Sequence, residues 1–67
     1  MVVVNGQVRG LADGTTLAGL VAELAGDRLR AGVAVAVNDT VVPRDAWSGT
    51  TLGDGDRVEV LTAVQGG

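Results

Sequence analysis

The sequence contains no cysteine, histidine or lysine, and its only aromatic residue is Trp47. Because cysteine and histidine are absent, neither disulfides nor the common zinc sites can stabilise this chain of 67 residues. The same absences remove the commonest general base and two of the main covalent nucleophiles. Only carboxylates and hydroxyls remain, thinly spread, so we expect neither an autonomous enzyme nor a bound metal or cofactor.

Positive charge is also scarce, since the chain carries five scattered arginines and a net charge of −3. Without a basic patch, binding to nucleic acid is not expected. The longest unbroken apolar run, Val33 to Val37, is far too short to span a membrane. The first residues show neither the charged region nor the cleavage site of a signal peptide. We therefore expect a cytoplasmic protein.

Aliphatic residues are plentiful, and 46% of the chain is hydrophobic. This composition favours a packed domain over disorder. The length predicts a single domain, residues 1–67, in which valine, leucine and alanine form the core and Trp47 fills part of it.

The first residues predict a β-hairpin. Val2 to Val4 is a β-branched run, and the Asn5-Gly6 dipeptide that follows is typical of a type I′ turn. We expect antiparallel strands at residues 2–4 and 7–11, with Val2 and Val4 pointing inward because alternate residues share a face.

A helix is predicted next, over residues 16 to 25. Thr15 or Thr16 can cap its first turn, and Gly26 fits the position that ends it. Apolar residues at spacings of three and four form one buried stripe: Leu17, Leu20, Val21 and Leu24.

The second half of the chain predicts three more strands. Val33 to Val37 is apolar on both faces, which is typical of a strand inside a sheet. A turn at Asn38-Asp39 leads to a short strand at Val41-Val42, which Pro43 ends. Residues 44–47 suggest a single irregular turn, and glycines and aspartates at 53–56 a second turn rather than a phosphate or metal loop. The last strand is expected at residues 58–64.

This order of elements predicts an α+β fold with a mixed sheet of four to five strands and one main helix packed on one face. A hairpin, a helix and further strands with a C-terminal strand make the β-grasp, or ubiquitin-like, arrangement. In that arrangement the last strand lies parallel to the first.

The last strand presents one set of residues to the helix and another to solvent. Val58, Val60, Thr62 and Val64 share one face, whereas Glu59, Leu61 and Ala63 share the other. An exposed apolar set on so small a domain indicates a docking surface. The candidate docking residues are Leu61 and Ala63 on one face, Val64 on the other, and also Arg44, which could pair with Asp45 or with a carboxylate of a partner.

The sequence ends on Gly66-Gly67, directly after the apolar residues of this strand. Two residues without side chains can enter a channel too narrow for any others. We expect residues 65–67 to form a flexible tail, in which the carboxylate of Gly67 is the reactive group. Gln65 and Gly66 would thread the tail into a partner.

Several short motifs occur in an ordered set that spans the chain: Val4-Asn5-Gly6, Thr16-Leu17, Ala36-Val37-Asn38, Val42-Pro43-Arg44 with Trp47, Gly55-Asp56 and Gly66-Gly67. With this set the chain resembles the ThiS/MoaD family of ubiquitin-like sulfur carriers, and its ThiS branch most of all. Val-Pro-Arg followed by Trp is the part that is most specific to ThiS.

The resemblance implies a mechanism and a set of partners. A ThiF-like adenylyltransferase would use ATP and magnesium to convert the Gly67 carboxylate to an acyl-adenylate. A desulfurase system would supply the sulfur that displaces AMP and leaves a thiocarboxylate on Gly67. A barrel enzyme, a ThiG-like thiazole synthase, would then take the sulfur for thiamin biosynthesis.

Other functions remain open at this stage. A MoaD-like small subunit of molybdopterin synthase is the closest alternative, although such proteins usually carry prolines before their Gly-Gly. The chain could also feed another sulfur metabolite, act as a ubiquitin-like protein modifier, or serve as a plain interaction module. A modifier without lysine could not build lysine-linked chains of itself.

Overall fold

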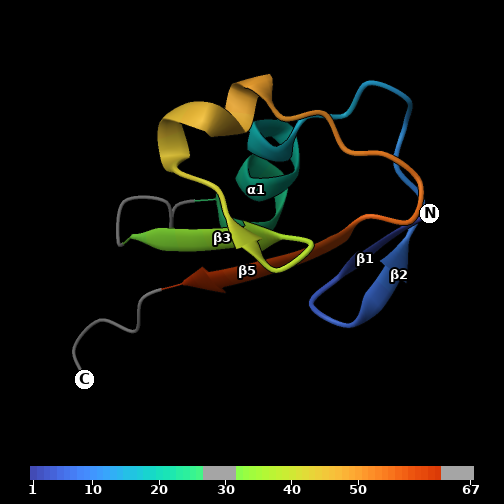
Figure 1. The fold of residues 1–67 in the computed structure, drawn as a ribbon, viewed down its shortest axis with the longest axis horizontal. Coiled ribbons are helices and arrows are strands. Elements are labelled where there is room, and N and C mark those ends of the chain that lie inside the picture. The colour runs from blue at the N-terminus through green and yellow to red at the C-terminus, as the bar shows by residue number, and fades with distance from the viewer. Residues whose placement is uncertain (27–31, 63–67) are drawn as a thin grey trace.

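A computed structural model of the chain describes residues 1–26 and 32–62. These residues form two layers, a twisted sheet and a layer of helices on one of its faces (Figure 1). The helical layer holds α1 (Leu17–Ala25) and the 3₁₀ helix η2 (Arg44–Gly49). No other described element covers the opposite face of the sheet, which is therefore the open face of the domain.

The sheet has five strands in the order β2-β1-β5-β3-β4. Their bounds are β1 Val2–Val4, β2 Gln7–Arg9, β3 Val33–Val37, β4 Thr40–Val41 and β5 Arg57–Thr62. Strands β1 and β5 are parallel neighbours, and the other neighbouring pairs are antiparallel. This is the predicted mixed sheet of the β-grasp arrangement, with the last strand beside the first and parallel to it.

Helix α1 forms where its caps and its apolar stripe coincide. The Thr16 hydroxyl accepts a hydrogen bond from the backbone N–H of Gly19 at 3.2 Å, so Thr16 rather than Thr15 is the N-cap. Gly26 ends the helix with φ of 52°, and its N–H donates to the Ala22 carbonyl. The buried face of the helix rests on the sheet and includes Leu17, Leu20, Val21 and Ala25.

The side chain of Trp47 extends from η2 and covers one side of the core, as predicted from the sequence. Its side chain is buried, and its indole N–H donates to the Val42 carbonyl at 2.9 Å. Buried tryptophan needs such a partner because an unpaired indole N–H is costly in an apolar environment. The buried core comprises Val2, Val4, Leu17, Leu20, Val21, Ala25, Val35, Trp47, Leu52, Val58 and Val60.

Some predicted boundaries differ from the structure. Strand β2 ends at Arg9 instead of residue 11, because Arg9 already pairs with Val2, where β1 begins. Strand β4 covers Thr40–Val41 instead of Val41-Val42, since the tight Asn38-Asp39 turn pairs Thr40 directly with Val37.

The segment after Pro43 is also more regular than the predicted single turn at 44–47. It forms the 3₁₀ helix Arg44–Gly49, in which the Ala46 N–H donates to the Pro43 carbonyl and the Thr50 N–H to the Trp47 carbonyl. The last strand begins one residue earlier than predicted, at Arg57, because that residue pairs with Val3.

Candidate functional site

The predicted reactive group lies outside the described residues. Gln65, Gly66 and Gly67, together with the docking candidates Ala63 and Val64, belong to the segment 63–67 beyond the described end of β5. What the structure describes is the strand that leads to this segment and the surfaces around it. These features determine how the tail could be presented.

Strand β5 is the central strand of the sheet. On one side, Val58 pairs with Val4 of β1. On the other side, an antiparallel ladder with β3 runs from the Val58–Val37 pair to the Thr62–Val33 pair. Strand β5 therefore has a neighbour on each edge, with β3 paired as far as Thr62 and β1 paired only at Arg57 and Val58.

Two asparagines in hairpin turns add side-chain hydrogen bonds to β5. Asn5, in the turn between β1 and β2, donates from Nδ2 to the Val60 carbonyl at 3.2 Å, and its Oδ1 accepts from the Val60 N–H at 2.8 Å. Asn38, between β3 and β4, accepts from the Arg57 N–H at 2.9 Å. Sequence patterns identified both asparagines only as turn residues, because their long-range partners become visible only in the fold.

The outward side chains of β5 and its neighbours form an apolar surface on the open face. Leu61 is 67% exposed and Val41 is 73% exposed, whereas Val58 and Val60 on the same strand as Leu61 point into the core. Leu61 borders two shallow hollows, of about 90 and 370 Å³. We define the Leu61 patch as the residues that project around them on this face, namely Ala34, Ala36, Val41, Glu59 and Leu61.

Arg44 lies in the other layer of the domain. It begins η2, which packs against α1, and its guanidinium lies 5.7 Å from the centre of the Trp47 ring. This distance suits a cation–π contact. Arg44 does not line either hollow beside Leu61, so the structure does not bring these two docking candidates together.

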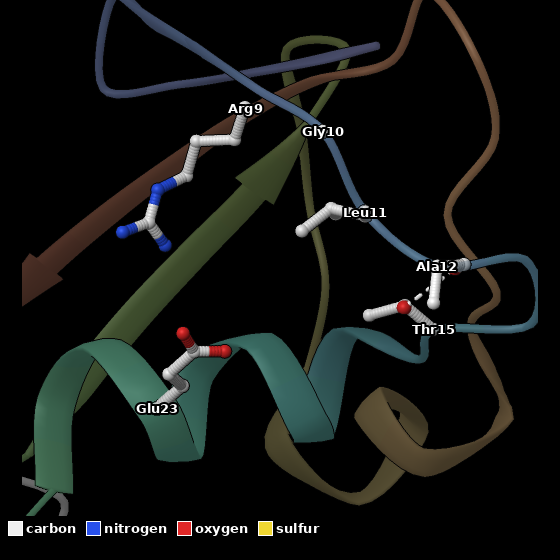
Figure 2. A pocket seen from close by; sticks show the side chains of 6 residues that line it. All are labelled: Arg9, Gly10, Leu11, Ala12, Thr15 and Glu23. Carbon is white, nitrogen blue, oxygen red and sulfur yellow. Dashed lines mark hydrogen bonds between the residues drawn. The ribbon is translucent and has the colours of Figure 1, made fainter.

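A third hollow, of about 470 Å³, lies between β2 and α1. Arg9 from β2 and Glu23 from α1 extend toward one another across it, and Leu11 and Ala12 line it along the segment that follows β2 (Figure 2). The hydroxyl of Thr15 is already occupied, because it donates to the Ala12 carbonyl at 2.6 Å. This arrangement offers charge of both signs, but it holds no paired acid and base of the kind that catalysis needs.

Comparison with known protein families indicates which of these features is functional. The model of the ThiS family matches residues 2–67. The chain belongs to the ThiS family. It is 35% identical over 63 residues to the sulfur carrier protein ThiS of Escherichia coli, and the alignment covers 94% of this chain and 92% of the relative.

Solved structures of the ThiS family have the same fold. The crystal structure of thiamine biosynthesis protein ThiS from Geobacter metallireducens superposes with a TM-score of 0.78, at 32% identity, covering 98% of this chain and 97% of the other. An NMR structure of a thiamine biosynthesis protein from the same organism gives a TM-score of 0.76 at the same identity and covers 98% and 86% of the two chains. The β-grasp prediction is thereby confirmed.

The turn at residues 53–56 is structural in this member of the ThiS family. Asp56 Oδ2 accepts from the Gly53 N–H at 2.8 Å, and its Oδ1 accepts from Asn38 Nδ2 at 3.0 Å. The bond from Gly53, followed by the bond from Asn38, lowers the pKa of Asp56, because both stabilise the carboxylate. Among residues 1–26 and 32–62 no group of three potential metal ligands occurs, and no helix there is long and apolar enough to cross a membrane.

Proposed function

We propose that the chain is a sulfur carrier of thiamin biosynthesis whose reactive group is the carboxylate of Gly67. The observation that carries this proposal is the ThiS family match, which extends over residues 2–67 and so includes Gly66-Gly67. The chain acts as a protein-bound donor and not as a catalyst, in agreement with its lack of histidine, cysteine and lysine.

The proposed reaction begins with activation of the tail. An oxygen of the Gly67 carboxylate attacks the α-phosphorus of ATP on a ThiF-like adenylyltransferase, and pyrophosphate leaves. A persulfide of a desulfurase system then attacks the acyl carbon, and the bond to AMP breaks. A second thiol of that system reduces the resulting acyl disulfide, so that a thiocarboxylate remains on Gly67 and the two donor sulfurs end in a disulfide. Adenylation is needed because a free carboxylate is a poor electrophile, whereas AMP is a good leaving group.

The chain's own composition suits this chemistry. A thiol near an activated acyl group could attack it, and the chain has no cysteine. Bound as a thiocarboxylate, the sulfur travels on the protein and is not released as free sulfide. A ThiG-like thiazole synthase is the proposed acceptor, and the cytoplasm, where ATP is available, is the proposed location.

We propose the Leu61 patch as the surface on which the activating enzyme docks. Among residues 1–26 and 32–62, Leu61 and Val41 are the most exposed large apolar side chains apart from Met1. An exposed apolar patch on a small domain favours association. The patch also adjoins the end of β5, so a partner bound there would be close to the start of the tail. Glu59 inside the patch favours a partner that presents a cation at this point.

Intact-mass spectrometry tests the reaction. After incubation with the activating enzyme, ATP, magnesium and a sulfur donor, the mass should rise by one exchange of oxygen for sulfur. Deleting Gly67 should abolish this shift and leave the melting temperature unchanged. A protein that never changes mass with any activating enzyme would contradict the proposal, and adducts on lysines of other proteins would indicate a protein modifier instead.

Substitutions of glycine test whether the tail must be narrow. Gly66→Ala should slow activation, because the added methyl group obstructs a channel that fits glycine. Gly49→Ala is the matched control, since a Cβ at Gly49 meets nothing within 4 Å. A pull-down with thiazole synthase and with the large subunit of molybdopterin synthase separates a ThiS-type acceptor from a MoaD-type one.

A further inference from the structure

Asn5 joins the turn of the first hairpin to the central strand. Besides the two hydrogen bonds between its carboxamide and Val60, its backbone N–H donates to the Val58 carbonyl at 2.9 Å. The last backbone pair of β1 with β5 is Val4 with Val58. The side-chain amide of Asn5 therefore continues the parallel ladder by one step, in place of a peptide group that has turned away into the hairpin.

The residue after Asn5 makes this amide chemically vulnerable. In an Asn-Gly sequence the backbone nitrogen of glycine can attack the side-chain carbonyl carbon, which expels ammonia and closes a five-membered succinimide. Water then opens the ring to aspartate or isoaspartate, so one water is consumed, one ammonia is released, and nothing is oxidised or reduced. Gly6 has no side chain to shield its nitrogen, and both residues are exposed to water.

The folded structure opposes this reaction. While the Asn5 carboxamide bonds to Val60 through both its nitrogen and its oxygen, its carbonyl carbon is held beside β5 and its amide nitrogen is engaged as a donor. Attack by the Gly6 nitrogen requires these two bonds to open first. The reaction rate in the folded protein is then limited by the population of the locally opened state.

We propose that Asn5 is a deamidation site that β5 protects in the folded state, and that its conversion to aspartate or isoaspartate loosens the hold of the first hairpin on β5. An aspartate has no donor for the Val60 carbonyl, and one of its oxygens faces that carbonyl instead. An isoaspartate adds a backbone atom to a two-residue turn. The modification acts on the strand that precedes Gly66-Gly67, and the proposal does not depend on what that tail carries.

Asn38 provides a comparison within the same molecule. It also lies in a two-residue hairpin turn, has φ of 50° against 49° for Asn5, and bonds to β5 through its side chain. The residue that follows it is Asp39, whose side chain hinders attack by its own backbone nitrogen. Asn38 should therefore remain intact where Asn5 reacts.

Peptide mapping by mass spectrometry tests the protection. The folded protein and the urea-unfolded protein are incubated at the same mildly alkaline pH, and the conversion of each asparagine is followed with time. We expect Asn5 to react about tenfold or more slowly in the folded protein, which corresponds to two hydrogen bonds that must open, and Asn38 to be unchanged in both. Equal rates for Asn5 in the two states would overturn the proposal.

Hydrogen exchange tests the consequence. The Val60 amide should lose about tenfold or more of its protection in Asn5→Ala, and part of it in Asn5→Asp, because a carboxylate can still accept from that N–H but repels the carbonyl. The amide of Arg57, which Asn38 holds, should keep its protection in both variants. Full protection of Val60 in Asn5→Asp would contradict the loosening, and if that variant does not fold, the rate comparison on the unaltered protein still decides whether β5 protects Asn5.

Discussion

Leu61 of β5 stands directly opposite Ala34 of β3 in the antiparallel ladder, and both side chains lie on the open face of the sheet. The next outward pair along the same strands is Glu59 with Ala36. Because its neighbours on β3 are alanines, no bulky side chain covers Leu61 from that strand. Most of the Leu61 side chain is therefore accessible to a partner.

We predict that Leu61→Ser weakens the complex with the activating enzyme by about tenfold or more, because a central apolar contact is lost. The free energy of unfolding should change by less than about 1 kcal/mol, since Leu61 contributes little to the core. Titration calorimetry measures the first quantity and urea unfolding the second. Val8→Ser is the matched control, because Val8 is 64% exposed on the far edge strand β2. Equal losses of affinity in the two variants would argue against the Leu61 patch.

The indole of Trp47 should contribute both volume and a hydrogen bond. Trp47→Phe leaves the Val42 carbonyl without its donor and should lower the free energy of unfolding by at least about 1 kcal/mol. Trp47→Ala also opens a cavity under η2 and should cost about 3–5 kcal/mol. Urea unfolding checks both values. An Ala variant no less stable than the Phe variant would show that the ring does not fill the core.

The cap of α1 can be tested with a conservative pair of substitutions. Thr16→Ala removes the oxygen that accepts from the Gly19 N–H and should lower the free energy of unfolding by about 1 kcal/mol. Thr16→Ser keeps that oxygen and should recover most of the loss. Thermal unfolding followed by circular dichroism distinguishes the two, and equal losses would assign the effect to the methyl group of Thr16 and not to the cap.

Acid should destabilise the fold partly through Asp56. Its pKa is lower in the folded chain than in the unfolded chain, chiefly because of the Gly53 N–H and then because of Asn38, so the unfolded state binds more protons in acid. The stabilisation is complete above about pH 4 and is lost as the pH falls through the folded-state pKa. Unfolding curves from neutral to strongly acidic pH should therefore show a smaller acid-dependent loss for Asp56→Asn. Asp45→Asn, outside this turn, should retain the contribution of Asp56.

Local patterns predicted most of the fold because local rules and tertiary packing agree in this chain. The Asn5-Gly6 turn, the stripe that contains Leu17 and Leu20, and the alternation of Val58 and Val60 each point to one structure. The boundaries that differ depend on partners. Strand β2 stops where β1 has no further residue to pair with Arg9, and no pattern within residues 7–11 contains that information.

The candidate site could also be predicted from the sequence only in part. Alternation along the strand separated Leu61 from Val58 and Val60, since alternate residues of a strand face opposite sides, but only the fold shows that Leu61 is on the outward face. Its neighbours Ala34 and Val41 come from other strands and required the register of the sheet. The hydrogen bonds of Asn5 span 55 residues of sequence, so no local pattern could reveal them.

The place of β5 between a parallel and an antiparallel neighbour has a mechanical consequence. A pull along β5 from its carboxyl end loads the hydrogen bonds to β1 and β3 in shear, so that they share the force instead of breaking in sequence like a zipper. Unfoldases that pull a protein by one terminus should therefore meet strong mechanical resistance when they pull on β5 from its carboxyl end.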